Sequence, residues 1–344
     1  MFLGELQHAS TVLVKDLLKV KKDEIVVITT DTQTDLSVAK AIAEVCENIQ
    51  AKPMLVIIPA PESVSMAADK DIPMEAISAA LCEADVWIEL NKQWLLYSTP
   101  YYNAKKYNKA LRHMCLTGTN ADTLISCVGK VDYDAMRDFT VCLKEKLAAA
   151  EDVLMRSQSG DEVTFKNVKG RPISVKMGNA DVPGTHLFVG QIGWTPELSS
   201  VNGVVCLDGS VAPDIGLISN PVKIHITDGV ITDITGGTEA ADYKAWLTGF
   251  GHEQMLRVSH AGIGFNPGAK LAGDILQDQR VWGSTTWGFG SISAGMLPPA
   301  GVEAPSHSDA VSLNTDIYLD GKALFINGKV VDPELKKLSE KFGK

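Results

Sequence analysis

The sequence has no cluster of positive charge. Its 344 residues include 32 lysine and arginine residues against 42 aspartate and glutamate residues, which gives a formal net charge of −10. The basic stretches are no longer than pairs such as Lys105-Lys106 and Lys336-Lys337. Because phosphate backbones are bound by clustered lysine and arginine side chains, we expect no nucleic acid partner.

Signals for membranes, export and disulfide frameworks are also missing. No run of 18 apolar residues occurs, so we expect no membrane-spanning helix and no membrane partner. The first residues, Met1–Leu6, lack the basic segment and apolar core of a signal peptide. The six cysteines are scattered without a CxxC pair, which favours reduced thiols over a disulfide or zinc framework. We therefore expect a cytoplasmic protein.

Several catalytic fingerprints are absent as well. No GxGxxG follows the first strand signal, which argues against dinucleotide binding, and no GxSxG nucleophile elbow occurs. His252-Glu253 begins like the HExxH motif of zinc proteases, but Leu256 stands where the second histidine is required.

The chain divides into two halves with different secondary-structure signals. The first half alternates amphipathic helical segments with short β-branched runs at 24–29, 54–58 and 85–90, which are typical of buried parallel strands. The second half is Gly-rich, with hairpin signals at Asp228-Gly229 and Asn327-Gly328. We predict an α/β N-terminal domain (1–155) with an open, mostly parallel sheet, and a Gly-rich α+β, mainly antiparallel C-terminal domain (156–344).

Three residues of the second half form a candidate metal site. His307 and Asp309 are two residues apart, so on a strand they would point to one face. His260 lies in the apolar run Val258–Gly264. Two histidines and one carboxylate are the ligand set of mononuclear sites with open positions, above all non-haem Fe(II). The alternatives are a surface loop around Ser306–Ser308 and a core histidine at position 260.

The second half resembles the 2,5-dihydroxypyridine 5,6-dioxygenases, which are distant relatives of the thermophilic M29 aminopeptidases. The matching stretches are 236–240, 259–269, 307–309 and 316–320, in the same order and spacing. The stretch 179–184 and the N-terminal half match more loosely. The resemblance implies that His260, His307 and Asp309 hold a mononuclear Fe(II).

The sequence departs from these relatives at three positions. Ser210 and Thr286 stand where M29 aminopeptidases have a glutamate and a histidine for a second metal, which disfavours a two-metal aminopeptidase. Tyr97 stands where the dioxygenases have a histidine for acid/base work, in the run Leu95-Leu96-Tyr97-Ser98. Tyrosine can donate a proton but is a poor base near neutral pH, so the exact substrate stays open.

We expect an Fe(II)-dependent, extradiol-type dioxygenase that opens the ring of a small hydroxylated N-heteroaromatic, such as a dihydroxypyridine. Tyr97 or His186 would transfer protons. Glu239 would orient a ligand histidine, or would serve only as a carboxylate at a helix N-terminus. Aromatic walls for a planar substrate would come from Trp282, Trp287 and Phe289.

Two other functions remain open at this point. The same ligands could hold Zn, Mn or Co in a metal-dependent hydrolase or aminopeptidase. A non-catalytic protein that binds a metal or a small ligand is the third possibility. Because antiparallel sheets have exposed edges, we expect a homo-oligomer.

Overall fold

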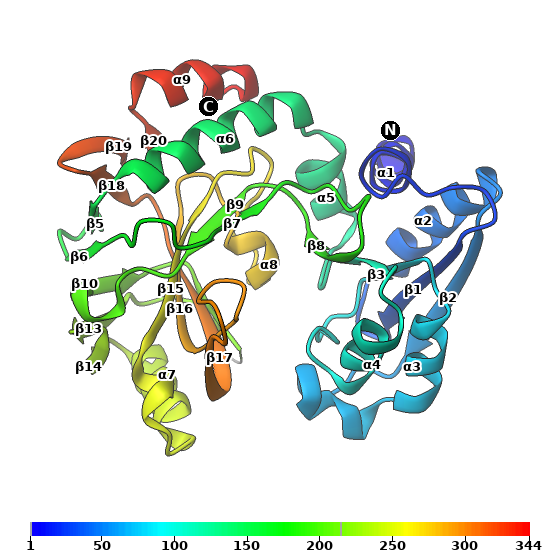
Figure 1. The fold of residues 1–344 in the computed structure, drawn as a ribbon, viewed down its shortest axis with the longest axis horizontal. Coiled ribbons are helices and arrows are strands. Elements are labelled where there is room, and N and C mark those ends of the chain that lie inside the picture. The colour runs from blue at the N-terminus through cyan, green and yellow to red at the C-terminus, as the bar shows by residue number, and fades with distance from the viewer. Residues whose placement is uncertain (1, 214) are drawn as a thin grey trace. The chain divides into compact units, whose positions relative to one another are not determined.

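The computed structural model describes residues 2–213 and 215–344, and the chain forms two compact units (Figure 1). The first unit comprises Met1–Val131 and Lys176–Val189, and the second comprises Asp132–Val175 and Gly190–Lys344. This division differs from the predicted boundary near residue 155. The long helix and the strand that precede residue 156 belong to the second unit, and a later segment returns to the first unit.

The first unit is built on a parallel sheet in the order β2-β1-β3-β4-β8. Its strands are β1 (Ile25–Asp31), β2 (Lys52–Ile58), β3 (Val86–Glu89), β4 (Arg112–Cys115) and β8 (Gly184–Leu187). Its α-helices are α1 (Phe2–Thr11), α2 (Leu36–Asn48), α3 (Met74–Cys82), α4 (Thr99–Tyr107) and α5 (Ala121–Leu124). Shorter turns of π- or 3₁₀-helix are η1 (Val12–Leu17), η2 (Ser65–Asp71) and η3 (Ile125–Gly129). The predicted parallel α/β sheet is confirmed.

Local sequence explains these elements. The β-branched run of β1 is buried from Val26 to Asp31, as expected for a central strand covered on both faces. Asp35 caps α2 because its side chain accepts a hydrogen bond from the backbone N–H of Ser37. Asp132 caps the long helix of the second unit in the same way, through the N–H of Ala135.

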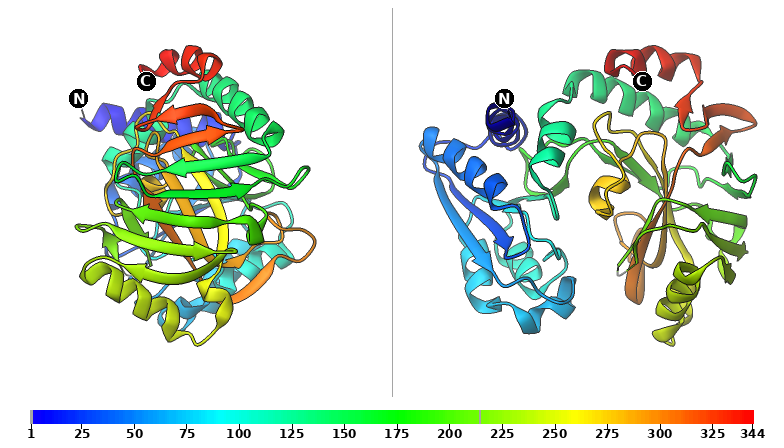
Figure 2. Two further views of the ribbon diagram at one scale, coloured as in Figure 1. Left: turned by 90° about the vertical axis from the view of Figure 1, so that its left-hand side faces the viewer. Right: turned by 180° about the vertical axis from the view of Figure 1, so that it is seen from behind.

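The second unit contains two antiparallel sheets, which confirms the predicted change of architecture. Sheet B has the order β14-β13-β10-β6-β5-β18-β19-β20, and its strands lie side by side in the left view of Figure 2. They are β5 (Asp152–Arg156), β6 (Glu162–Lys166), β10 (Asn202–Leu207), β13 (Val222–Thr227), β14 (Val230–Thr235), β18 (Asp316–Leu319), β19 (Lys322–Ile326) and β20 (Lys329–Val330).

Sheet C has the order β12-β11-β17-β16-β15-β9-β7. Its strands are β7 (Ile173–Lys176), β9 (Gln191–Trp194), β11 (Ser210–Ala212), β12 (Gly216–Leu217), β15 (Val258–Gly264), β16 (Thr285–Ile292) and β17 (Val302–Ser312). The α-helices of the unit are α6 (Tyr133–Ala149), α7 (Thr238–Gly249), α8 (Ile275–Asp278) and α9 (Pro333–Ser339). Its 3₁₀ turns are η4 (Leu198–Ser200), η5 (Glu253–Leu256) and η6 (Glu340–Phe342).

One face of sheet C packs against sheet B and α7. The ring of Phe165 in β6 lies 6.2 Å from Trp194 in β9 and 5.9 Å from Trp287 in β16. The Tyr243 hydroxyl of α7 lies 2.8 Å from the hydroxyl of Ser308 in β17. This face therefore belongs to the core, and the side chains that alternate with it along each strand point the other way.

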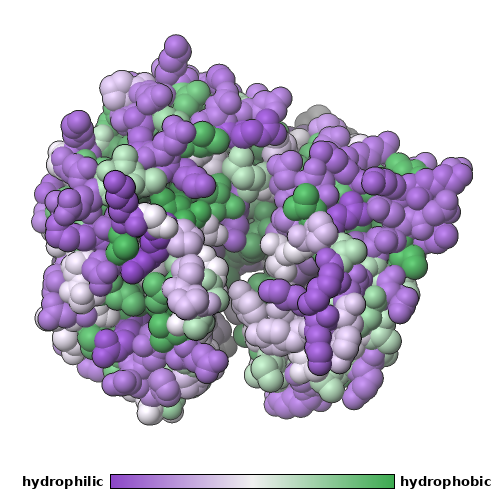
Figure 3. Space-filling view, viewed as in Figure 1, coloured by the Kyte–Doolittle hydropathy of each residue, from purple (hydrophilic) through white to green (hydrophobic). Residues whose placement is uncertain are grey.

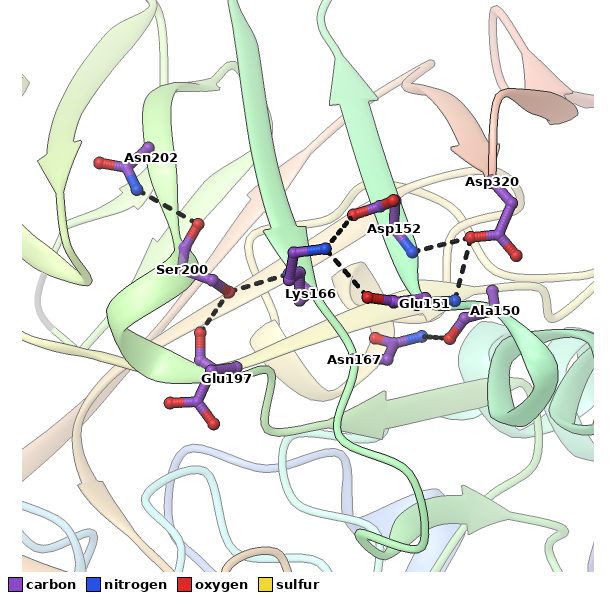
Figure 4. A network of polar contacts seen from close by, with 9 residues as sticks. All are labelled: Ala150, Glu151, Asp152, Lys166, Asn167, Glu197, Ser200, Asn202 and Asp320. Carbon is purple, nitrogen blue, oxygen red and sulfur yellow. Dashed lines mark hydrogen bonds and ion pairs between the residues drawn. The ribbon is translucent and has the colours of Figure 1, made fainter.

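Exposed polar contacts hold the start of β5 beside the end of β6 (Figure 4). The Lys166 ammonium lies 3.1 Å from the carboxylate of Glu151 and 2.9 Å from that of Asp152. The carboxylate of Asp320 accepts the backbone N–H groups of Glu151 and Asp152 at 3.0 and 2.8 Å. Exposed ion pairs of this kind contribute little individually to the free energy of unfolding.

The two helices at one end of the second unit, α6 and α9, run beside each other in Figures 1 and 2. The ammonium of Lys146 in α6 joins them through the carboxylates of Asp332 and Glu334, at 3.2 and 3.0 Å. Hydrophilic residues cover much of the face shown in Figure 3, with smaller hydrophobic patches between them. Within residues 2–213 and 215–344, none of the helices has the length and hydropathy needed to cross a membrane.

Candidate functional site

The three predicted ligands meet on one face of sheet C. His260 lies in β15, whereas His307 and Asp309 lie in β17, so the surface-loop alternative for this motif is wrong. Strand β16 runs between them, and its Gly288 is opposite both His260 and Asp309. Two segments about fifty residues apart in the sequence are thereby brought together.

The three side chains converge on the Asp309 carboxylate. Its Oδ1 atom lies 3.2 Å from Nε2 of His260 and 3.4 Å from Nε2 of His307. The two imidazole rings are nearly parallel, at an interplanar angle of 8° and a centroid distance of 5.3 Å. Each residue offers one ligand atom, and these three atoms lie within 4.8 Å of one another. Such a cluster has the dimensions of a mononuclear metal site.

A glycine makes room for one of the imidazoles. A Cβ atom built on Gly288 would lie 2.1 Å from Nδ1 and 2.2 Å from Cε1 of His260. No side chain larger than hydrogen therefore fits at position 288 while His260 keeps its place. Glycine at position 288 is therefore a requirement for this placement of His260.

The backbone of β16 determines which nitrogen of His307 carries the hydrogen. Its Nδ1 atom lies 2.8 Å from the carbonyl oxygen of Ser291, and a carbonyl oxygen only accepts, so Nδ1 is the donor. In a neutral imidazole, Nε2 then presents a lone pair, and that lone pair faces the Asp309 carboxylate. Two acceptors at 3.4 Å repel each other unless a cation stands between them.

That cation is either a proton on His307 or a metal ion shared by all three residues. Two imidazole nitrogens and one carboxylate oxygen suit divalent ions of the first transition row, and the three donors converge. The residues therefore fit a mononuclear metal.

The charges of the cluster shift the pKa values of its members. Burial lowers the pKa of His307, but the charge and hydrogen bond of Asp309 and the Ser291 carbonyl outweigh it, and the pKa is raised. Burial raises the pKa of Asp309, but both histidines oppose it more strongly and hold that pKa well below its usual range. The carboxylate is thus ionised at neutral pH, as a metal ligand must be.

Two of the other predicted catalytic residues belong to a different unit of the chain from this cluster. Tyr97 and His186 belong to the first unit, whereas the cluster belongs to the second. Tyr97 follows the strand β3, has a positive φ of 67° and packs edge-on against Tyr101 at 5.6 Å. The Nε2 atom of His186, in β8, lies 2.8 Å from the carbonyl oxygen of Val182.

Glu239 lies in the first turn of α7. Its carboxylate accepts a hydrogen bond from the backbone N–H of Ser219 at 3.1 Å and contacts the Asn220 amide at 3.5 Å. Hydrogen bonds from backbone N–H groups, its own first, lower the pKa of this carboxyl group. These contacts match the expected carboxylate at a helix N-terminus, and none of them involves a ligand histidine.

The aromatic walls predicted from the sequence are wrong. Trp287 and Phe289 alternate with Gly288 along β16, so their side chains point to the opposite face, toward Phe165 and Tyr243. The remaining residue, Trp282, packs against Phe139 of α6 at 5.3 Å and against Phe342 at 6.0 Å. Sequence proximity to the ligands did not reveal which face each ring occupies.

The two positions that lack second-metal ligands lie on the ligand face of sheet C. Ala212 in β11 and Gly288 in β16 both pair with Asp309. Ser210 is two residues from Ala212 and Thr286 is two residues from Gly288, so both side chains share the face of Asp309. Both hydroxyls are buried, and neither has a hydrogen-bond partner among the described residues. A hydroxyl group is a weak metal ligand, so these positions supply no second carboxylate or imidazole.

Another group of potential ligands, which the sequence did not reveal, lies in the first unit. Glu89, His113 and Cys115 are buried, with ligand atoms within 4.8 Å of one another. The Glu89 carboxylate accepts the backbone N–H groups of Leu95 and Leu96 and lies 2.9 Å from Nε2 of His113. We interpret this group as a hydrogen-bonded core pair that holds the loop leading to residue 97. Glu89 comes from β3, whereas His113 and Cys115 both come from β4, and the register of these two strands brings them together.

The fold and the site together define the class of protein. One unit is α/β and the other is antiparallel, and the antiparallel unit carries two histidines and one aspartate on the face of sheet C where Gly288 leaves room for His260. The family model of 2,5-dihydroxypyridine 5,6-dioxygenase matches residues 10–332, and the chain belongs to this family. The resemblance predicted from the sequence is thereby confirmed.

Individual relatives agree with this assignment. The 2,5-dihydroxypyridine 5,6-dioxygenase of Pseudomonas putida KT2440 is 30% identical over 209 residues, which are 56% of this chain and 59% of that protein. The match thus spans about three fifths of that relative's length.

Two solved structures share the fold. The 2,5-dihydroxypyridine dioxygenase from Pseudomonas putida KT2440 has a TM-score of 0.76 at 21% identity, covering 98% of this chain and 99% of that one. Wild-type AmpT from Thermus thermophilus has a TM-score of 0.71 at 13% identity, covering 96% and 100%.

Proposed function

We propose that this protein is an Fe(II)-dependent ring-opening dioxygenase of a small hydroxylated N-heteroaromatic, of the dihydroxypyridine type. The family match supports the reaction class. The observation that carries the metal assignment is the arrangement of two imidazole Nε2 atoms around the Asp309 carboxylate, with a lone pair of His307 directed at it. Without a proton on His307 or a metal ion between the two residues, that arrangement is repulsive.

His260, His307 and Asp309 would hold the iron. When bound, a ferrous ion with three protein ligands supplies open positions at which a chelating substrate and O₂ can meet. The protein's part is to fix the ligands: the Ser291 carbonyl sets the tautomer and ring orientation of His307, and Gly288 accommodates the imidazole of His260.

Proton transfer is proposed for Tyr97. Its phenol is 47% exposed and able to donate a proton, whereas the buried Tyr243 has a raised pKa because burial disfavours its phenolate. Replacing Tyr97 by Phe should lower kcat and leave Fe(II) binding unchanged. Equal kcat values for the two proteins would remove Tyr97 from the mechanism, and His186 would then be tested in the same way.

The metal assignment is tested with single-residue variants of the cluster. His260→Ala, His307→Ala and Asp309→Ala should each lose Fe(II) binding and oxygen consumption with 2,5-dihydroxypyridine. His252→Ala, which changes an exposed histidine of the same unit, should retain both. Retention of bound iron by all three cluster variants would contradict the proposal.

A hydrolase with Zn, Mn or Co is the second candidate, because the same two histidines and one aspartate can hold these ions around an activated water. The hydroxyls of Ser210 and Thr286 weigh against a two-metal version of it. Strict anaerobiosis separates the candidates: ring-opening oxygenation stops without O₂, whereas hydrolysis continues. Turnover of a peptide or amide substrate without O₂ would favour the hydrolase.

A further inference from the structure

Thr286 is a close neighbour of His260 on the ligand face of sheet C. His260 is opposite Gly288, and Gly262 is opposite Thr286, in the pairing of β15 with β16. Residues 286 and 288 point to the same face because they are two apart on one strand. Thr286 is therefore the diagonal neighbour of His260, and the Cβ atoms of such neighbours are about 7 Å apart.

The imidazole of His260 turns its Nδ1 edge toward β16. A Cβ built on Gly288 would lie 2.1 Å from Nδ1, whereas a Cβ built on Gly193, in β9, would lie 4.0 Å from Cδ2. The Nδ1 atom of His260 therefore faces β16, which carries Thr286, and its Cδ2 atom faces β9 on the other side.

Both of these polar atoms are buried without a protein partner. Across residues 2–213 and 215–344, neither Nδ1 of His260 nor Oγ1 of Thr286 has a hydrogen-bond partner. The Nε2 atom of His260 points at Asp309, 3.2 Å away, and must present its lone pair to bind a metal, so Nδ1 carries the hydrogen. Buried N–H groups are almost always hydrogen-bonded, and a metal-ligating histidine nearly always donates its second N–H.

We propose that Thr286 is a positioning residue for His260 and acts through one ordered water molecule. The water accepts the Nδ1–H of His260 and donates to Oγ1 of Thr286. Two hydrogen bonds of about 2.8 Å in series span up to ~5.6 Å, which suits side chains on diagonal neighbours. This inference rests on the proposed function, because it assigns Thr286 a role toward the same metal ligand.

The test compares two isosteric changes that each remove a buried hydroxyl. Thr286→Val removes the hydroxyl on the Nδ1 side of His260. Thr195→Val is the matched control: Thr195 is equally buried and also lacks a partner, and it follows Trp194, which pairs with Ala261 on the Cδ2 side. The Cδ2–H group is at most a weak hydrogen-bond donor, so the control should leave His260 in place.

Fe(II) alone is titrated anaerobically into each protein, without substrate. Thr286→Val should weaken Fe(II) binding by about 10- to 100-fold, the usual effect of losing an outer partner of a ligand histidine. The Fe(II) affinity of Thr286→Ser should stay within about twofold of that of the unchanged protein, because serine retains the hydroxyl. The affinity of Thr195→Val should also stay within about twofold, because Thr195 lies on the Cδ2 side of His260. In protein labelled with ¹⁵N-histidine, the Nδ1–H signal of His260 should exchange slowly and be lost in Thr286→Val.

Unchanged Fe(II) affinity in a folded Thr286→Val protein would overturn this inference, provided that His260→Ala abolishes binding. If His260→Ala also binds normally, the proposed function itself fails. Should Thr286→Val not fold, as judged by circular dichroism, Thr286→Ala removes the same hydroxyl without adding bulk and is judged by the same criteria.

Discussion

Replacing Gly288 by alanine tests the geometry of the site with a single methyl group. The new Cβ would lie 2.1 Å from Nδ1 of His260, whereas ordinary van der Waals contact begins near 3.4 Å. The imidazole must therefore move by about 1.3 Å, or β16 must shift by a similar amount. Metal–ligand distances tolerate only about 0.2 Å, so this movement removes His260 from the ligand set.

We expect Gly288→Ala to bind Fe(II) at least ~10-fold more weakly, and to lose about 1–3 kcal/mol of unfolding free energy through overpacking. Gly249→Ala is the control, because a Cβ at that position of α7 meets nothing within 4 Å. Anaerobic calorimetric titration gives the affinity, and urea unfolding gives the stability. A Gly288→Ala protein with normal Fe(II) affinity would refute the packing argument.

Two further predictions concern the carboxyl groups of Glu89 and Asp208. Glu89→Gln should lower the unfolding free energy by ~1–3 kcal/mol, because the amide leaves one acceptor oxygen for the N–H groups of Leu95, Leu96 and His113; an unchanged urea midpoint at pH 7 would contradict this. Burial raises the pKa of Asp208 above its usual 3.8, so the folded state binds the carboxyl proton more tightly than the unfolded state does. The free energy of unfolding therefore increases as the pH falls from the raised pKa toward 3.8. Asp208→Asn should lack this gain, and parallel curves of unfolding free energy against pH for the two proteins would show that the reasoning is wrong.

Local patterns predicted the elements of the fold well. The β-branched runs of the first half became β1, β2 and β3, and the glycine-containing hairpin at Asp228-Gly229 joins β13 to β14. The domain boundary was harder to place, because local patterns do not show which sheet a segment joins. Strand β5 pairs with β18, about 160 residues later, and β8 pairs with β4 of the first unit.

The three candidate ligands could be picked out of the sequence because their residue types and spacing carry chemical information. His307 and Asp309 share a face of any strand, His260 completes a set of two histidines and one carboxylate, and the family resemblance pointed to the same three residues. The hollow at Gly288 and the partner of His307 at Ser291 were missed, because they depend on the register of β16 between its neighbours. The same register explains why the predicted aromatic walls face the core.

The central claim is that one metal ion is held by His260, His307 and Asp309. The most direct test is elemental analysis of protein purified anaerobically, beside the His307→Ala variant prepared in the same way. The account predicts about one iron per chain in the unchanged protein and almost none in the variant. Two metal ions per chain, or equal iron in both proteins, would contradict it.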